Sequence, residues 1–305
     1  MKILVFTEKP FAPAAVKAIE NSINASGNEL EVVEGGTRAD LLEAIRNADG
    51  LIVRSDKIDN DIMDAAPQLK VIVRAGAGYD NIDLDAATKH GICVMNTPGQ
   101  NSNAVAELVF GMIIMMCRNQ YNGKSGTELK DKTLGLYAFG QVGRNVARIA
   151  KGFGMHVSAL DKFVPDVMME GEGVKPLHSA DELFAENQFV SLHIPATAET
   201  RKSIGYDLVM KMPQNGVLIN TARKEVIDEE GLMKALEERP DLRYVSDIKP
   251  DTAEEFEKKF AERVFFTPKK MGAQTAEANF NAGVAAAEQV VAYLTDGWDK
   301  YRVNK

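Results

Sequence analysis

The sequence has few of the residues that characterise disulfide-bonded or metal-binding proteins. Cys93 and Cys117 are the only cysteines among 305 residues, and each lies inside an apolar run. We therefore expect two buried, reduced thiols and a cytoplasmic location. The cysteines and the four histidines form no recognisable metal-ligand pattern, so no metal site is expected.

Basic runs and long apolar runs are also scarce. The formal net charge is −8 and no long stretch of lysine and arginine is present, which argues against a nucleic-acid or anionic-membrane partner. The apolar run at 109–117 is about half as long as a membrane-spanning helix. The apolar run at the N-terminus is too short for a secretory signal, so we expect neither a leader nor a membrane span.

What the sequence does contain is a repeated alternation of short apolar strands and helical segments. The length of 305 residues and the 45% content of hydrophobic residues suit about two domains. The alternation predicts an α/β protein with two doubly wound, Rossmann-like parallel-sheet domains and a cleft between them. The last helix, at 275–297, is expected to return to the first domain, because something must cover that domain's sheet.

The segment 133–161 has the pattern of a dinucleotide-binding βαβ unit: strand, glycine turn, helix and strand. Gly140 permits close approach of a pyrophosphate, and Gly143 lets the helix lie against the first strand. The helix N-terminus supplies unpaired N–H groups and the positive end of the helix dipole. Asp161 is spaced as expected of the carboxylate that binds the adenosine ribose, which favours NAD over NADP.

The first glycine of this fingerprint is replaced by Ala138. Alanine is tolerated if its φ is negative and strongly disfavoured if the turn demands a positive φ. We interpret Ala138 as a tolerated variant. Taken alone, the A-x-G-x-x-G pattern is equally compatible with a close-packed βα turn that binds nothing, so other parts of the chain must decide.

Two further loops follow apolar strands, where open α/β sheets bind ligands. Arg74 ends one strand, and Gly76 and Gly78 after it let backbone N–H groups face a carboxylate; a flexible βα loop is the alternative. Arg223 follows another strand and suits bidentate binding of a carboxylate; a surface arginine is the alternative.

The fingerprint occurs together with several specific motifs. They are VRSDKI, VRAGAGYDNID, NTPGQNSNAVAEL, SLHIPATAET, NTARKEVID, VSDIKPD and TPKKMGAQT. In this combination the chain resembles the D-2-hydroxyacid dehydrogenase family almost end to end, and most of all its members that oxidise D-3-phosphoglycerate. No regulatory extension is expected after the last residue. The resemblance implies a substrate-binding domain of residues 1–98 and 283–305, an NAD-binding domain of residues 99–282, and a homodimer built on the helix near 103–118.

The resemblance also implies roles for individual residues. Arg223 grips the substrate carboxylate and helps to polarise its carbonyl, and Arg54 binds the substrate phosphate. The other implied substrate ligands are Arg74, Ala75, Gly76 and Gly78. The residues implied to bind NAD are Ala138, Phe139, Gly140, Gln141, Val142, Asp161, His193, Pro195, Thr221, Ala222 and Asp247.

The sequence departs from the family at the acid/base. The family has a histidine in T-P-H-x-G-x-x-T, whereas TPKKMGAQT here is one residue longer and contains no histidine. Counting forward from Thr267 places Lys269 at the histidine position, and counting back from Gly272 places Lys270 there. We favour Lys270, because the helix that starts after the glycine sets the register better than a loop can.

The glutamate that assists the family's histidine is also missing. It lies five residues after the aspartate that is here Asp247, where this chain has Thr252, with Asp251 one place earlier. A free lysine has a pKa of ~10.4, so a lysine base near pH 8 needs a pKa about two units lower. A nearby glutamate would raise that pKa, so losing both residues together is coherent. Reduction needs no such lowering.

We therefore expect NAD-dependent oxidation of D-3-phosphoglycerate to 3-phosphohydroxypyruvate, and the reverse, in L-serine biosynthesis with a lysine acid/base. The expected partner is this phosphorylated small molecule. Two alternatives remain open: a dehydrogenase for another D-2-hydroxy acid, such as a hydroxypyruvate/glyoxylate reductase, and a catalytically silent NAD-sensing binding protein.

Overall fold

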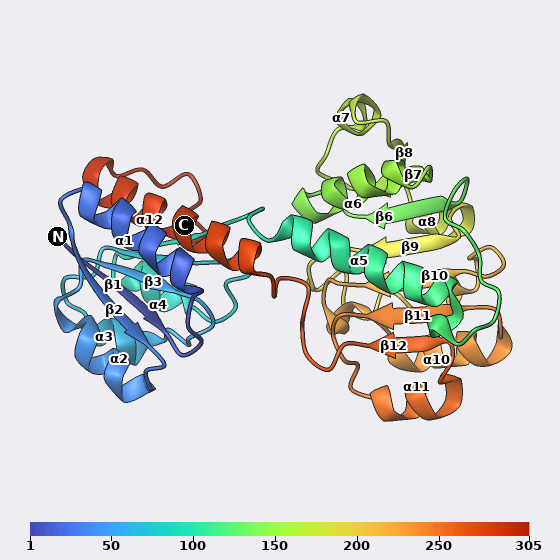
Figure 1. Cartoon of the computed structure of the whole chain (residues 1–305), viewed down its shortest axis with the longest axis horizontal. Helices are drawn as coiled ribbons and strands as arrows, with labels where there is room; N and C mark the ends of the chain where they lie inside the picture. The colour runs from blue at the N-terminus through green and yellow to red at the C-terminus, as the bar shows by residue number, and fades with distance from the viewer. Residues whose placement is uncertain (305) are drawn as a thin grey trace. The chain divides into compact units, whose positions relative to one another are not determined.

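Parallel strands and helices alternate through the chain and form two sheets (Figure 1). The computed structural model describes residues 1–304. Unit 1 contains residues 1–101 and the described residues from Gln274 onward, and unit 2 contains residues 102–273. The predicted α/β class with two parallel sheets is confirmed. The domain boundary expected at 283 would fall inside the last helix.

Unit 1 is built on a five-stranded parallel sheet of order β2-β1-β3-β4-β5. Its strands are β1 (Lys2–Thr7), β2 (Glu29–Glu34), β3 (Gly50–Val53), β4 (Val71–Arg74) and β5 (Cys93–Asn96). Its helices are α1 (Pro13–Ala25), α2 (Arg38–Ala44), the 3₁₀ turn η1 (Ile45–Asn47), α3 (Asn60–Asp64), α4 (Leu84–Lys89) and α12 (Ala276–Asp296).

Helices cover both faces of the unit 1 sheet, because successive strand residues point to opposite faces. Ile3 and Val5 face one core, which α1 and α12 complete, and Leu4 and Phe6 face the other, which α2, α3 and α4 complete. The prediction that the last helix packs on the first sheet is confirmed. In Figure 1 the blue α1 and the red α12 lie beside each other on this sheet.

Unit 2 is built on a seven-stranded parallel sheet of order β12-β11-β10-β9-β6-β7-β8. Its strands are β6 (Thr133–Tyr137), β7 (His156–Leu160), β8 (Lys175–Leu177), β9 (Phe189–Leu192), β10 (Val217–Asn220), β11 (Arg243–Ser246) and β12 (Val264–Phe266). Its helices are α5 (Ser102–Cys117), α6 (Gln141–Gly152), α7 (Asp166–Gly171), α8 (Ala180–Glu186), α9 (Tyr206–Val209), α10 (Glu229–Glu238) and α11 (Ala253–Phe260), with 3₁₀ turns η2 (Asn119–Tyr121) and η3 (Lys224–Val226).

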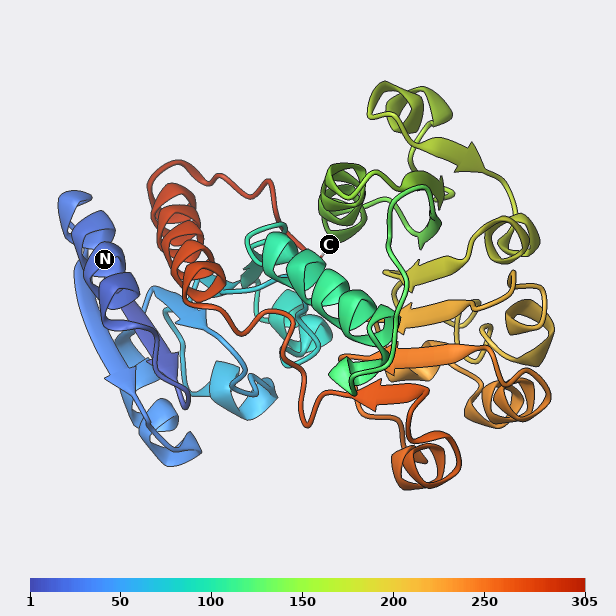
Figure 2. The same ribbon diagram turned by 45° about the vertical axis from the view of Figure 1, so that its right-hand side comes forward.

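Two apolar cores lie on the two faces of the unit 2 sheet. One is formed with α5 and α6, and the other with α8, α9, α10 and α11. Figure 2 shows these two sets of helices on opposite faces. The predicted apolar helix is α5, whose residues Val109, Ile113 and Met116 are completely buried in the first core.

Both cysteines are buried thiols, as predicted. Cys93 lies on β5 and Cys117 ends α5, and neither forms a disulfide. Burial raises the pKa of Cys93 to about 11 and also raises that of Cys117. Neither thiol is a reactive thiolate at neutral pH.

Two short elements were not expected from the sequence. They are helix α7 and the edge strand β8, and both lie after Asp161. Only Met169 of α7 is buried, so the apolar periodicity is too weak to reveal this helix. Pro176 lies within β8, and an edge strand tolerates a proline that an inner strand would not.

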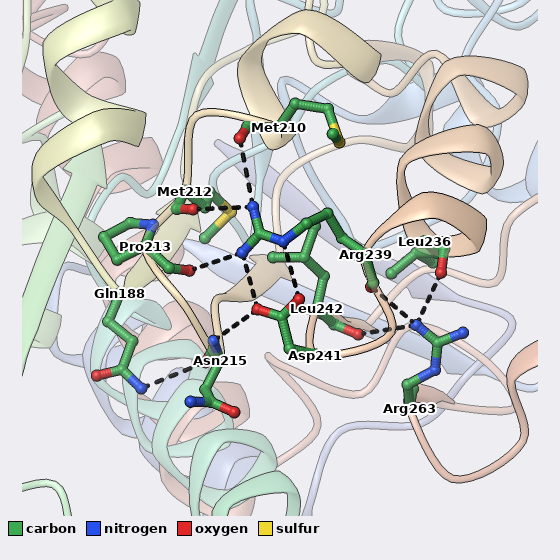
Figure 3. Close-up of polar contacts among 10 residues, drawn as sticks. All are labelled: Gln188, Met210, Met212, Pro213, Asn215, Leu236, Arg239, Asp241, Leu242 and Arg263. Atoms are coloured by element: carbon green, nitrogen blue, oxygen red, sulfur yellow. Dashed lines mark hydrogen bonds and ion pairs between the residues drawn. The ribbon is translucent and has the colours of Figure 1, made fainter.

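The amino ends of β10 and β11 are joined by a dense polar network around Arg239 (Figure 3). Its guanidinium forms a bidentate ion pair with Asp241, with Nε–Oδ1 and Nη2–Oδ2 distances of 2.8 and 2.7 Å. It also donates to the carbonyl oxygens of Met210, Met212 and Pro213. The Asp241 carboxylate accepts a further bond from the backbone N–H of Asn215 at 2.8 Å.

Within residues 1–304, no helix is both long enough and apolar enough to cross a lipid bilayer.

The Arg239 network predicts that wild type and an Asp241→Asn variant differ in stability by an amount that depends on pH. The hydrogen bond from Arg239 lowers the pKa of Asp241 from 3.8 to about 2. A depressed carboxylate pKa stabilises the fold above pH 3.8, and that contribution is lost as the pH falls towards 2. Urea unfolding from pH 6 to pH 2 should therefore show Asp241→Asn as less stable than wild type, with the difference shrinking below about pH 4.

A surface ion pair provides the control. Asp181→Asn removes the exposed pair with Lys211, which is worth about 0–1 kcal/mol at most. The free energy of unfolding of Asp181→Asn should therefore stay close to that of wild type from pH 6 to pH 2. If the difference in free energy of unfolding between Asp241→Asn and wild type stayed constant down to pH 2, the lowered pKa assigned to Asp241 would be contradicted.

Candidate functional site

The carboxyl edge of the unit 2 sheet gathers the residues expected to bind a cofactor. The strands β6, β7, β9, β10 and β11 are followed directly by Ala138, Asp161, His193, Thr221 and Asp247, respectively. All these strands are parallel, so the five residues lie along one edge. β6 lies between β7 and β9, so the winding direction reverses beside Ala138 and His193. Doubly wound sheets bind their ligands at this position.

The turn between β6 and α6 fits a bound phosphate group. Gly140 is the N-cap of α6, and a Cβ placed on it would meet no atom of residues 1–304 within 4 Å. A Cβ on Gly143 would clash with the carbonyl oxygen of Ala138, so only glycine fits there. The first turn of α6 contains no acidic residue and no capping side chain among the described residues. Its N–H groups therefore remain suited to an anion.

The turn does demand a positive φ at its first position, which corrects our interpretation of Ala138. Its φ is 87°, in a region that alanine rarely adopts. The N–H of Ala138 donates to the carbonyl of Leu160 at 2.9 Å, which ties the turn to β7. A left-handed conformation costs an L-residue roughly 1–2 kcal/mol. The substitution is therefore strained rather than neutral.

Asp161 braces this strained turn. One carboxylate oxygen accepts a hydrogen bond from the N–H of Phe139 at 2.8 Å, and the other accepts from Phe163 and Val164 at 2.8 and 3.2 Å. An ionised carboxylate offers about four acceptor positions, so these three bonds leave room for a further donor. The side chain of Phe139 is completely buried, so only its backbone could face a ligand.

His193 is a neutral imidazole beside β10. Its Nδ1 lies 3.3 Å from the hydroxyl of Thr221, and its buried Nε2 has no hydrogen-bond partner among the described residues. Burial lowers the pKa of His193 to about 3, so it carries no charge at neutral pH. It also joins no metal-ligand group, since no three His, Cys, Asp or Glu side chains of residues 1–304 converge on a metal position.

Asn220 shapes the loop that carries Arg223, a role that our sequence reasoning missed. The side chain of Asn220 is buried, accepts from the N–H of Ala222 and donates to the carbonyl of Arg223, both at 2.9 Å. Arg223 also donates to the carbonyl of Ala222 at 2.9 Å and is half-buried. An asparagine at a strand end favours such local turns, which is the signal that could have revealed it.

The lysine pair lies between β12 and α12, and both lysines are exposed. The carboxylate of Asp251, next to the position of the family's glutamate, forms an ion pair with Lys224 at 2.5 Å. The N–H groups of Asp251 and Thr252 both donate to Glu229 at 2.9 Å. Glu229 therefore holds the loop after β11, another role that the sequence reasoning missed.

In unit 1, Arg54 follows β3 and braces two neighbouring segments. It donates to the carbonyl oxygens of Lys9 and Pro10 at 3.0 and 2.8 Å, and to Oδ1 of Asn279 at 2.5 Å. Its guanidinium lies 5.1 Å from the centre of the Phe11 ring. Burial lowers the pKa of Arg54, which nevertheless remains charged.

Arg74 ends the adjacent strand β4, and the glycine loop closes over it. Its Nε donates to the carbonyl of Arg54 at 2.9 Å. Gly76 has a φ of 151°, which residues with a side chain rarely adopt, and a Cβ there would displace the Arg74 guanidinium. The carbonyls of Gly76 and Ala77 are held by Thr97 and Asn96. Arg54, Arg74 and the glycine loop thus share the carboxyl edge of the unit 1 sheet.

A cavity of about 510 Å³ lies at the same edge, near the ends of β1 and β2. It is lined by Phe6, Glu8, Gly35, Gly36, Thr37, Arg38, Leu41, Asp56 and Lys57. Asp56 accepts a hydrogen bond from the N–H of Arg54 at 3.4 Å, so the cavity borders the Arg54 loop. The implied substrate ligands are not part of its lining.

The conformation of Ala138 predicts a stabilising substitution. Ala138→Gly relieves the positive φ but makes the unfolded chain more flexible, so the free energy of unfolding should rise by about 0.5–1 kcal/mol. Urea unfolding of the two proteins measures this difference. Ala159→Gly, on buried β7, is the control and should destabilise. A loss of stability in Ala138→Gly would contradict the strain assigned to this turn.

Comparison with known proteins agrees with the fold and the motifs. The family model described as "D-isomer specific 2-hydroxyacid dehydrogenase, catalytic domain" matches residues 3–304. The D-3-phosphoglycerate dehydrogenase of Methanocaldococcus jannaschii is 37% identical over 305 residues, covering 95% of this chain and 57% of the relative. The hydroxypyruvate reductase of Thermotoga maritima is 37% identical over 281 residues, covering 86% of this chain and 90% of the relative.

A solved structure is similar over the whole chain. The NAD⁺-bound 3-phosphoglycerate dehydrogenase of Entamoeba histolytica is 49% identical, with a TM-score of 0.89, and the match covers 100% of this chain and 99% of that one. The chain spans little more than half the length of several curated relatives; for the Methanocaldococcus jannaschii protein the share is 57%. The chain belongs to the D-isomer specific 2-hydroxyacid dehydrogenase family.

Proposed function

We propose that this chain is an NAD-dependent dehydrogenase that interconverts D-3-phosphoglycerate and 3-phosphohydroxypyruvate, with Lys270 as its acid/base. The carboxyl edge of the unit 2 sheet carries the proposal. Its glycine turn and Asp161 follow the adjacent strands β6 and β7, and Arg223 lies in the loop after β10 at the same edge. The 49% identity to an NAD⁺-bound 3-phosphoglycerate dehydrogenase supports the choice of cofactor and substrate.

The cofactor assignment rests on the turn between β6 and α6. The uncapped start of α6 and the open space at Gly140 suit a pyrophosphate. The remaining acceptor position of Asp161 suits a ribose hydroxyl, and its charge disfavours a 2′-phosphate. Gln141, Val142, Pro195 and Ala222 complete the proposed set. NAD, when bound, supplies the hydride acceptor for oxidation and NADH supplies the donor for reduction.

Two cationic side chains have separate proposed roles. Arg223 binds the substrate carboxylate, because a guanidinium offers two parallel donors that match two carboxylate oxygens. Lys270 exchanges a proton with the oxygen on the reacting carbon. A lysine exposed to water is protonated at neutral pH, and a protonated lysine is the acid that reduction requires. The reductive direction is therefore the one to assay first.

The substrate phosphate is assigned to Arg54, with Arg74 and the loop of Ala75, Gly76 and Gly78 beside it. An observation on Arg54 also favours the second candidate, a hydroxypyruvate or glyoxylate reductase. Its guanidinium already donates to two backbone carbonyls and to Asn279. A side chain so engaged has fewer donors left for a phosphate.

The cellular setting is part of the same proposal. Two buried, unpaired thiols suit a reducing cytoplasm, and the product suits L-serine biosynthesis.

A homodimer on α5 is proposed because Leu108, Ile114 and Met115 are only half-buried on this apolar helix. Sedimentation equilibrium should give twice the 33.3 kDa of one chain.

Arg54→Gln tests the phosphate assignment. Wild type should reduce 3-phosphohydroxypyruvate with a higher kcat/KM than hydroxypyruvate. The variant should lose about 10–100-fold in kcat/KM for the phosphorylated substrate, because it loses one or more charge-assisted hydrogen bonds. Hydroxypyruvate is the internal control, since any damage to the bracing of Lys9, Pro10 and Asn279 lowers turnover of both substrates. Equal losses on both would exclude Arg54 as a phosphate ligand, and a wild-type preference for hydroxypyruvate would support the reductase.

The lysine assignment is tested by paired substitutions. Lys270→Ala should lower kcat for NADH-dependent reduction by about 10²–10⁴-fold, the usual contribution of a general acid, and leave NADH binding intact. Lys269→Ala is the matched control and should keep kcat within a few-fold of wild type. The reverse result would transfer the role to Lys269. Full activity in both variants would exclude a lysine acid/base, and tight NADH binding without turnover in wild type would support a binding protein.

A further inference from the structure

A buried carboxylate lies directly beneath the lysine pair. Asp247 follows β11 and is 0% exposed. Its Oδ1 accepts from the hydroxyl of Thr267 at 3.0 Å and from the N–H of Met271 at 2.6 Å. Its Oδ2 accepts from the N–H of Gly272 at 2.8 Å. Each of these donors belongs to the segment TPKKMG, which carries both lysines.

The position of Asp247 is itself set by the sheet. Its N–H donates to the carbonyl of Asn220 at 3.0 Å, which continues the pairing of β11 with β10. The segment also approaches very closely, since a Cβ on Gly272 would lie 2.8 Å from Oδ2 of Asp247 and 3.2 Å from Val105. The loop is therefore tied at both ends to one group on the rigid sheet.

These hydrogen bonds hold the backbone of Lys270 more directly than that of Lys269. The peptide bond between Lys270 and Met271 is planar and includes the Cα of Lys270. Because the N–H of that plane is bound to Asp247, the Cα of Lys270 is held in the anchored plane. Lys269 lies one peptide further away, with only the anchored Thr267 two residues before it. The anchor therefore orients Lys270 most directly, which agrees with the register chosen from the motif.

We propose that Asp247, together with Thr267, is a positioning residue that fixes the backbone of Lys270 at the carboxyl edge of the unit 2 sheet. The inference rests on the proposed function, because positioning matters to turnover only if Lys270 is the acid/base. It differs from the cofactor contact that the family resemblance implies for Asp247. The loop uses three of the roughly four acceptor positions of the carboxylate.

Asp247→Asn tests the anchor sharply, because an amide cannot satisfy the three donors. If its oxygen faces Thr267 and Met271, its NH₂ group faces the N–H of Gly272. If it is turned over, the NH₂ group faces the N–H of Met271. In either orientation one backbone N–H loses its acceptor and meets another donor, which is unfavourable in a buried position.

The experiment compares Asp247→Asn and Thr267→Val with two controls. Thr267→Ser keeps the hydroxyl and should therefore match wild type in hydrogen exchange, in the Kd for NADH and in kcat and KM. Ser158→Ala removes a hydroxyl that donates to Asn187 at 3.0 Å, from a residue that is 5% exposed. Thr267 is closely similar, since it is 4% exposed and its hydroxyl donates to Asp247 at 3.0 Å. Ser158→Ala controls for general loss of stability in the same unit.

Three quantities are measured: amide hydrogen exchange of the peptide covering 267–273, the Kd for NADH, and kcat and KM for reduction. Asp247→Asn should exchange at Met271 and Gly272 at least about tenfold faster, and at saturating NADH it should lose about tenfold or more in kcat, which a change in the Kd for NADH alone would not produce. Thr267→Val should show smaller changes in the same direction, and Ser158→Ala should show none of them.

Two results would overturn the proposal. One is unchanged exchange at Met271 and Gly272 in both Asp247→Asn and Thr267→Val. The other is a rise in the Kd for NADH that accounts for the whole loss of kcat/KM, which would make Asp247 a cofactor contact only. If the wild type reduces no 2-oxo acid, or if Lys270→Ala is fully active, the proposed function fails separately, while faster exchange in Asp247→Asn still supports the anchor.

Discussion

Parallel strand pairing is the constraint on which the candidate site depends. In unit 2 every strand runs in one direction, so the residues that follow β6, β7, β9, β10 and β11 meet along one edge although they span more than 100 positions of the chain. No single segment could bring a glycine turn, a carboxylate and a guanidinium together in this way. The apolar cores on both faces of the sheet hold the strands in register and therefore hold the edge.

Polar side chains order the loops at this edge; Asn220 and Asp247 are buried, and Asp161 is partly exposed. Asp161 and Asp247 each accept hydrogen bonds from backbone N–H groups of a neighbouring loop, and Asn220 accepts one from the loop that follows it. A buried polar group without such partners would be costly, whereas a satisfied one permits few alternative loop conformations. The same three residues thus belong to the fold and to the candidate site. In this site the roles of binding a ligand and of shaping the loop overlap.

The two edges of the unit 2 sheet contrast in their local energetics. At the amino edge, Arg239 and Asp241 join neighbouring turns with well-formed hydrogen bonds. At the carboxyl edge, Ala138 adopts a positive φ, and Nε2 of His193 is buried without a partner among the described residues. Local rules are often broken at functional sites, because a ligand there requires a geometry that the isolated chain disfavours.

The sequence by itself determined the α/β class and the burial of both cysteines, because these follow from the periodicity of apolar residues along the chain. Only the tertiary structure decided the positive φ of Ala138 and the loop N–H groups that Asp161 and Asp247 bind. It also decided that Arg54 donates hydrogen bonds to Lys9, Pro10 and Asn279. The physical reason is that a backbone angle in a tight turn and the donors available to a carboxylate depend on segments distant in sequence. A pattern of residue types does not specify how those segments meet.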